Sequence, residues 1–210
     1  MLELFFSTFA TLFVVIDPVG CAPIFAGLVR GNSHRDTVQI AIRATLVATL
    51  VLLAFALVGT QLLASLHIEL DAFRIAGGMM LFLIALEMVF EKRTRRDEER
   101  AEQVLHEPHR PAPADDIAVF PMAMPMMAGP GSIASVMLLM ARASGWDAKL
   151  VVLGALGAVM ALTLLSLAAA GPLMKVLGTR VEGVITRLLG VLLGALAVQY
   201  VIDGLRGVIH

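Results

Sequence analysis

Two short stretches of this sequence combine helix-breaking residues with groups that bind ions. The first holds Asp17, Pro18 and Gly20, and the second holds Gly129, Pro130, Gly131 and Ser132. In each stretch a proline follows a residue that often caps helices, so Pro18 and Pro130 are each predicted to be the first residue of a new helix. The first N–H groups of such a helix lack partners and carry the positive end of the helix dipole, which favours anions.

The two stretches differ in the chemistry that they offer. The Asp17 carboxylate can cap its own helix, or it can face an ammonium group, a cation or a proton; both interpretations stay open at this stage. Residues 129–131 expose bare backbone that a small anionic group such as a carboxylate can approach, with the Ser132 hydroxyl as an extra donor. Thr11, together with Ser7 and Thr8, precedes the first stretch and is expected to line a cavity at the two stretches.

The composition places both stretches in a membrane protein. Of the 210 residues, 59% are hydrophobic and only 16% are charged, and the mean hydropathy is +0.87, more apolar than a soluble domain can bury. Apolar runs of roughly 20 residues match the thickness of the hydrocarbon core and predict transmembrane helices. We assign six helices, at about 4–29, 38–64, 72–90, 117–141, 149–170 and 184–205.

Several function classes are disfavoured by what the sequence contains. The net charge is −1 with scattered basic residues, so no nucleic-acid partner is expected. Cys21 is the only cysteine, which excludes an internal disulfide and a CxxC metal or redox motif. No histidine lies in an apolar segment to serve as a base for Ser132, which disfavours an intramembrane enzyme. The GxxxxGK[ST] motif is absent, so we expect no resident cofactor and only H⁺ or Na⁺ as a coupling ion.

An internal duplication relates the two halves of the chain. Arg74 falls on Arg187 at an offset of 113 positions, within matching apolar patterns, and Pro18 falls on Pro130 at an offset of 112. We therefore predict three regions: a first three-helix repeat at 1–90, a polar cytoplasmic linker at 91–116, and a second three-helix repeat at 117–210.

The odd number of helices in each repeat sets the predicted fold class. A second copy with three spans must enter the membrane in the opposite orientation, as in many secondary transporters. The sequence thus predicts an all-α membrane protein with six transmembrane helices, built from two inverted three-helix repeats, with helices 1 and 4 broken at midspan. Broken helices must be buried in protein or line a wet cavity, because orphan backbone groups are costly in lipid. Proline kinks needed only for packing are the alternative explanation.

The sequence also resembles a known family. The segments "FFSTFATLFVVIDPVGCAPIF", "RIAGGMMLFLIALEM" and "FPMAMPMMAGPGSI" are similar to those of the MarC family of bacterial and archaeal inner-membrane proteins, over nearly the whole chain. The resemblance implies a six-helix integral membrane protein, and some relatives are described as transporters of small neutral amino acids. The run "PMAMPMM" departs from the commoner Leu/Ile-rich pattern; we expect its methionines, Met122, Met124, Met126 and Met127, to pack flexibly rather than to bind metal.

These observations predict a transporter and its partners. The favoured function is a secondary transporter of a small zwitterion, ahead of a channel or exporter for another small metabolite and of a membrane protein that does not transport. The predicted partners are the lipid bilayer and a small-molecule substrate, and a homo-oligomer is left open. If segments one and four span the inner membrane, the 91–116 loop is cytoplasmic and both termini are periplasmic. Re-entrant hairpins at these two segments give the same balance of basic residues and remain an alternative.

Overall fold

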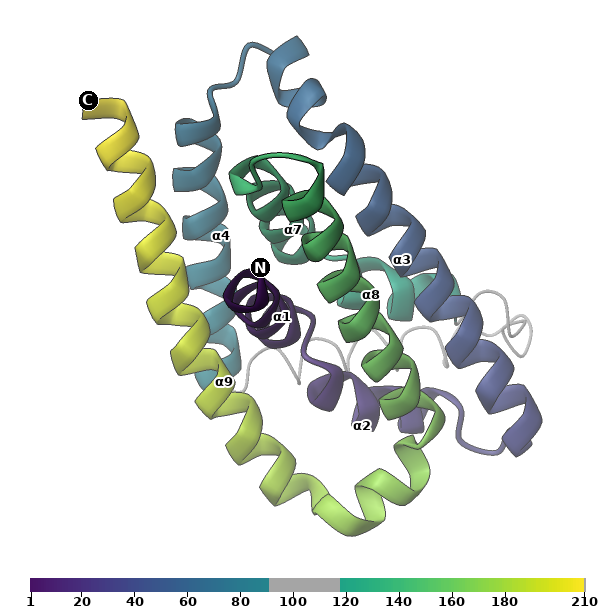
Figure 1. Ribbon diagram of the computed structural model, residues 1–210. Helices are drawn as coiled ribbons and strands as arrows, with labels where there is room; N and C mark the ends of the chain where they lie inside the picture. Colours follow the sequence, from purple (N-terminus) through teal and green to yellow (C-terminus); the bar gives the residue numbers. More distant parts are fainter. Residues whose placement is uncertain (91–117, 210) are drawn as a thin grey trace.

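The computed structural model describes residues 1–90 and 118–209, and all regular secondary structure within these ranges is helical (Figure 1). The all-α class is therefore confirmed for the described residues, whereas the predicted linker at 91–116 lies outside them. The helical elements are α1 (Leu2–Ile16), α2 (Pro18–Leu28), α3 (His34–Ser65), α4 (Leu70–Val89), η1 (Ala118–Met127), α7 (Pro130–Arg142), α8 (Trp146–Ala168) and α9 (Ala170–Ile209).

The described helices include five candidate membrane spans, or six if a bent pair is counted as one. The five are Leu2–Leu28, His34–Ser65, Leu70–Val89, Trp146–Ala168 and Val181–Ile209. The bent pair is η1 followed by α7, which meet at an angle of 54°. The predicted number of six helices corresponds to counting this pair as a single span.

The long helices follow from apolar sequences with a buried stripe. In α3 the residues Ile40, Ala44, Ala48, Leu52 and Ala56 recur every four positions and are buried, whereas leucines on the opposite side are exposed. The Ser33 hydroxyl accepts a hydrogen bond from the Asp36 N–H at 3.2 Å and caps the start of this helix. A helix with one buried face and one exposed apolar face suits contact with protein on one side and lipid on the other.

The last predicted helix, at 184–205, lies within the candidate membrane span Val181–Ile209, and α9 as a whole begins at Ala170, before a kink at Gly178, where φ is 67°. The segment before Gly129 is less regular than a half-helix, since Phe120 and Met124 adopt extended backbone angles. Both precede prolines, and a residue before proline is pushed out of the α region by the proline ring.

α1 and α7 occupy the centre of the molecule. In Figure 1 the α4–α9 pair lies on one side of them and α3 and α8 lie on the other. One buried apolar cluster, which includes Leu12, Met127 and Leu156, joins α1, α2, α3, η1, α7 and α8. A second cluster, which includes Val15 and Leu138, joins α1 and α7 to α4 and α9. The two central helices therefore contribute to both halves of the core.

The α4–α9 pair is antiparallel and packs closely through glycines. A Cβ atom on Gly78, in the first half of α4, would lie 2.8 Å from the Ala197 carbonyl oxygen in the second half of α9. A Cβ atom on Gly190, early in this contact surface of α9, would lie 2.8 Å from the Cβ of Met88 at the end of α4. Small residues let helix backbones approach each other in membranes, where van der Waals packing replaces the hydrophobic effect as the main attraction.

We predict that Gly78→Ala destabilises the protein by about 1–3 kcal/mol, because the new methyl group would overlap the α9 backbone and force the helices apart. The matched control is Gly157→Ala in α8, where a Cβ atom would meet nothing within 4 Å. Thermal unfolding in detergent measures both variants. Equal melting temperatures for Gly78→Ala and Gly157→Ala would contradict the close α4–α9 packing.

Candidate functional site

Asp17 ends one helix and begins the next. Its backbone lies in the left-handed region, with φ 54° and ψ 68°, and its N–H donates to the Phe13 carbonyl at the end of α1. Aspartate tolerates this conformation better than most residues with a Cβ atom. Its Oδ1 accepts a hydrogen bond from the Gly20 N–H at 3.0 Å, and Pro18 is the first residue of α2, as the sequence predicts. The Asp17 side chain is buried, with the residue 3% exposed.

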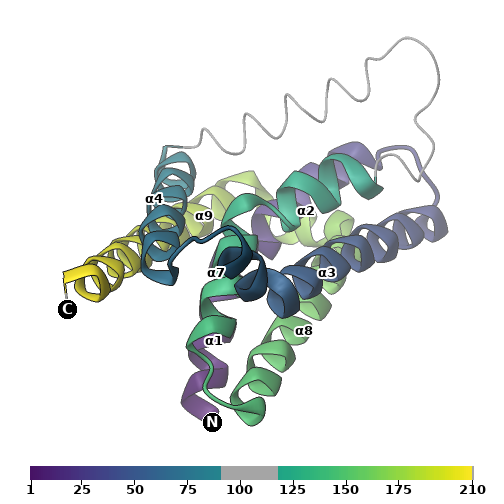
Figure 2. The ribbon, with the colours of Figure 1, turned by 90° about the horizontal axis from the view of Figure 1, so that it is seen from above.

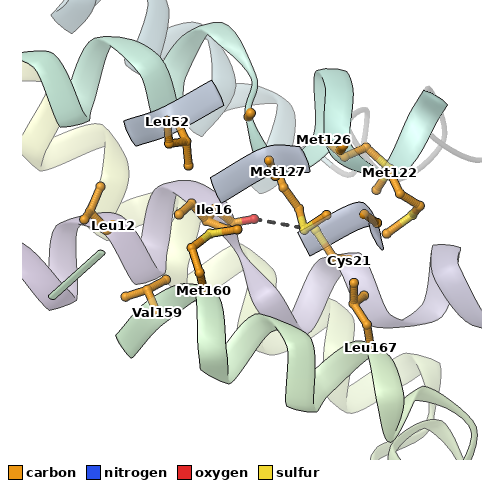
Figure 3. Packing of buried hydrophobic residues seen from close by; sticks show 14 of the residues in the cluster. Leu12, Ile16, Cys21, Leu52, Met122, Met126, Met127, Val159, Met160 and Leu167 are labelled. Carbon is orange, nitrogen blue, oxygen red and sulfur yellow. Dashed lines mark hydrogen bonds between the residues drawn. The ribbon is translucent and has the colours of Figure 1, made fainter. Parts of the chain in front are cut away.

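The backbone groups at this interruption find partners close by. The Cys21 thiol lies 3.6 Å from the Ile16 carbonyl oxygen and donates to it, as Figure 3 shows. The Cys21 N–H in turn donates to the Asp17 carbonyl at 3.0 Å. A buried carbonyl without a partner is costly, so Cys21 stabilises the end of α1. This role for the single cysteine is not visible in the sequence, where it shows neither a partner nor a motif.

The second interruption is built without a side-chain cap. Gly129 precedes α7 in an extended conformation, Pro130 is the first helical residue, and no side chain caps this end. The Ile133 N–H donates to the Gly129 carbonyl at 3.0 Å. A Cβ atom on Gly129 would lie 2.4 Å from the Pro125 carbonyl oxygen, so the backbone itself requires glycine here. The start of α7 therefore differs from the start of α2, where a carboxylate occupies the same position.

The structure brings the two interruptions together. The Val15 Cγ1 atom lies 3.7 Å from the position that a Cβ atom on Gly131 would take. Val15 is two residues before Asp17, and Gly131 is two residues after Gly129. The same Gly131 position lies 2.5 Å from the Ile84 Cδ1 of α4, so in this conformation a protein side chain, rather than a ligand, approaches the glycine.

The other predicted site residues lie around this junction. Thr11 and Ser132 are buried, Gly20 is half-buried, and Pro130 is exposed. Thr8 and Ser135 are also completely buried, and neither hydroxyl oxygen has a hydrogen-bond partner. The sequence analysis groups Thr8 with Thr11 but misses Ser135. Its position four residues after Gly131, on the same face of α7, is the signal that identifies it.

The methionines before Gly129 lie mostly in the core. Met122 and Met127 are fully buried and Met126 nearly so, and Figure 3 shows them near Cys21 and Ile16. Met124 is 44% exposed and does not join them. No group of three or more His, Cys, Asp or Glu side chains that could hold a metal ion occurs among residues 1–90 and 118–209. The packing role expected for the methionines thus agrees with three of the four.

Two polar contacts of the second half are not evident from the sequence. Arg142 at the end of α7 forms an ion pair with Asp203 of α9, and its guanidinium lies 4.9 Å from the centre of the Tyr200 ring. The Asp203 carboxylate also accepts a hydrogen bond from Gln199 at 2.6 Å. This cluster joins the end of α7 to α9.

Glu182 is, like Asp17, a buried acid. It is 5% exposed and accepts a hydrogen bond from the Thr186 hydroxyl at 3.2 Å.

Two apolar grooves lie away from the interruptions. They are lined by α4 and α9 residues only, including Met79, Phe82 and Val198, and have volumes of about 410 and 490 Å³. Most of these side chains are exposed on the outside of the helix pair. An exposed apolar helix face is expected to contact acyl chains in a membrane, so the grooves are not part of the candidate site.

The long apolar helices, packed through glycine and exposing apolar side chains on their outer faces, define an integral membrane protein that crosses the bilayer several times. The chain belongs to the MarC family: the family model described as "MarC family integral membrane protein" matches residues 2–209. It is 35% identical to a UPF0056 membrane protein of Methanocaldococcus jannaschii over 206 residues, which cover 98% of each chain.

Other relatives agree with this assignment. The chain is 34% identical to a UPF0056 membrane protein of Archaeoglobus fulgidus, with 97% of this chain and 93% of the relative covered. It is also 34% identical to the UPF0056 membrane protein YvbG of Bacillus subtilis, with 99% and 96% covered. These names state a membrane location and no substrate. No solved structure matches this chain.

We predict that Gly20→Ala disturbs the Asp17 cap. A Cβ atom on Gly20 would lie 2.2 Å from the Asp17 Oδ2 atom, so the carboxylate must turn away and the Gly20 N–H loses its acceptor. Loss of an N-cap costs about 1 kcal/mol. The control is Gly27→Ala in the same helix, where a Cβ atom would meet nothing within 4 Å. In thermal unfolding, Gly20→Ala should melt below Gly27→Ala; the opposite order would contradict a stabilising cap.

Proposed function

We propose that this protein is a secondary transporter of a small solute, a small neutral amino acid, bound between the interruptions at Asp17 and Gly129. The observation that carries the proposal is a buried carboxylate at one helix interruption, beside a second interruption whose helix start has no side-chain cap. Ionisable residues inside a membrane are costly and mark sites of transport or ion binding. Helix starts at interruptions are typical of transporter substrate sites.

The packing supports two inverted repeats. The sequence match places α4 on α9, and these two helices pack in opposite directions. In the two halves α1 corresponds to η1, α2 to α7, α3 to α8 and α4 to α9. The main contacts follow this correspondence, since α1 packs on α8 as η1 packs on α3. Likewise α2 packs on α8 as α7 packs on α3, and α2 packs on α9 as α7 packs on α4. Such a correspondence is expected when two copies of one three-helix unit are related by a two-fold axis in the membrane plane.

Each interruption suits one end of a zwitterion. The start of α7, with the backbone of residues 129–131 and the Ser132 hydroxyl, would hold the carboxylate of the amino acid. Asp17 would hold the ammonium group or a coupling H⁺ or Na⁺, and Pro18 and Gly20 would fix the turn that presents it. Thr11, on the buried face of α1, would add a hydroxyl on the α1 side of the site. Transport by this route requires no resident cofactor or metal.

We predict that Asp17→Asn leaves a folded protein whose uptake is lost or no longer follows the ion gradient, whereas Asp17→Glu keeps partial activity. Asparagine caps a helix about as well as aspartate, and it also tolerates the left-handed backbone of this position. It carries no charge and does not titrate. The measurement is gradient-driven uptake of glycine, alanine and serine into liposomes, with thermal stability measured alongside.

The outcomes of this experiment separate the functions. Normal, gradient-dependent uptake by Asp17→Asn would reduce Asp17 to a helix cap. Uptake that follows only the concentration of the solute, in the wild-type protein, would favour a channel. Failure of the folded wild-type protein to take up or release any of these amino acids would overturn the amino-acid proposal and favour an exporter of another metabolite or a protein that does not transport.

A further prediction concerns orientation in the inner membrane. If the two interrupted segments, α1–α2 and η1–α7, both span the membrane, the termini are periplasmic and the 91–116 loop is cytoplasmic. Each repeat then has three spans, so the chain returns to its starting side after six spans. Reporter fusions at His210 that are active on one side only would measure this. A cytoplasmic signal from the C-terminal fusion would instead favour re-entrant hairpins at the two interruptions.

A further inference from the structure

Thr8 of α1 and Ser135 of α7 are two of the three buried hydroxyl side chains without a hydrogen-bond partner among the described residues; the third is Thr45 of α3, which is 6% exposed. Thr8 and Ser135 are fully buried, and neither the Thr8 Oγ1 nor the Ser135 Oγ atom has a hydrogen-bond partner. Hydroxyls in membrane helices usually donate to the backbone of their own helix. Thr163 does so, with its Oγ1 atom 2.8 Å from the Val159 carbonyl oxygen, and Thr49 does the same with the Thr45 carbonyl at 2.7 Å.

The two hydroxyls lie on the helix faces that carry the contact between Val15 and Gly131. Thr8, Thr11 and Val15 are spaced by three and four residues and therefore share one face of α1. Val15 lies next to Gly131, and Ser135 follows Gly131 by one turn of α7. The N-terminus and the connection from α7 to α8 lie at the same end of the molecule in Figure 2, so α1 and α7 run in opposite directions.

Because α1 and α7 are antiparallel, residues of the two helices can be compared by their positions along the helix axes. Four residues of helix span about 6 Å, so Ser135 lies as far beyond Gly131 as Thr11 lies before Val15. Thr8 lies one turn further in the same direction, toward the N-terminal end of the molecule. The hydroxyls on these helix faces thus continue away from the two interruptions, toward the end where α1 begins.

We propose that Thr8 and Ser135 form a second polar subsite, through which an amino-acid solute passes between α1 and α7 after it leaves the interruptions. This inference rests on the proposed transport function. Each hydroxyl donates a hydrogen bond to the solute carboxylate and replaces part of its hydration. A buried hydroxyl without a partner destabilises the empty protein, and a bound carboxylate removes that cost.

The test uses Thr8→Val and Ser135→Ala in the full chain, reconstituted in liposomes, with glycine, alanine and serine as probes. Each variant should show kcat/KM for uptake reduced roughly tenfold or more, the loss expected for one hydrogen bond to a charged group. The melting temperature should be unchanged or higher, because the substitution removes an unsatisfied polar group. Thr8→Ser keeps the hydroxyl and should retain uptake. The control Thr163→Val removes a hydroxyl that bonds its own helix and should leave uptake unchanged.

Other outcomes overturn the inference in distinguishable ways. Wild-type uptake by both variants means that the solute does not use these hydroxyls, and leaves the transport function intact. A lower melting temperature together with a proportionate loss of active protein means that they form structural bonds. If the folded wild-type protein neither takes up the three amino acids nor is stabilised by them against heat, the subsite fails together with the proposed function.

Discussion

The structure depends on one constraint: a helix that is interrupted inside an apolar segment must find partners for the backbone groups that it releases. At the first interruption the partners come from the adjoining residues. The Asp17 carboxylate accepts from the Gly20 N–H, and the Cys21 thiol donates to the Ile16 carbonyl. Both hydrogen bonds lie within a buried apolar cluster, where backbone groups without partners would be costly.

The second interruption meets the same constraint in another way. Its sequence supplies no side chain to cap α7, and Gly129 fits against the Pro125 carbonyl only because it lacks a Cβ atom. No side chain caps the early N–H groups of α7. The two interruptions thus differ, one with an acidic side chain at the helix start and one without a side-chain cap. The zwitterionic substrate that we propose requires this difference, because its two ends carry opposite charges.

The local features of this arrangement could be predicted from the sequence, and the tertiary ones could not. Pro18 and Pro130 mark helix starts because proline is favoured at the first helical position, and the apolar runs identify α3, α4 and α8 to within a few residues. The predicted last span at 184–205 agrees with Val181–Ile209, whereas the sequence does not predict the helical residues between Ala170 and the kink at Gly178. The Arg142–Asp203 pair joins residues far apart in the sequence, and no local pattern announces it. Ser135 becomes interesting only once α7 is known to lie against α1.

Capping α2 does not by itself require an aspartate at position 17. Asparagine and serine cap helices about as well as aspartate, and either would accept the same bond from the Gly20 N–H without bringing a carboxylate into the core. Burial of an ionised carboxylate costs several kcal/mol before its partners compensate, whereas a cap contributes about 1 kcal/mol. In the proposed transporter, a group that binds an ammonium, a cation or a proton during each cycle needs a charge, which a neutral helix cap lacks.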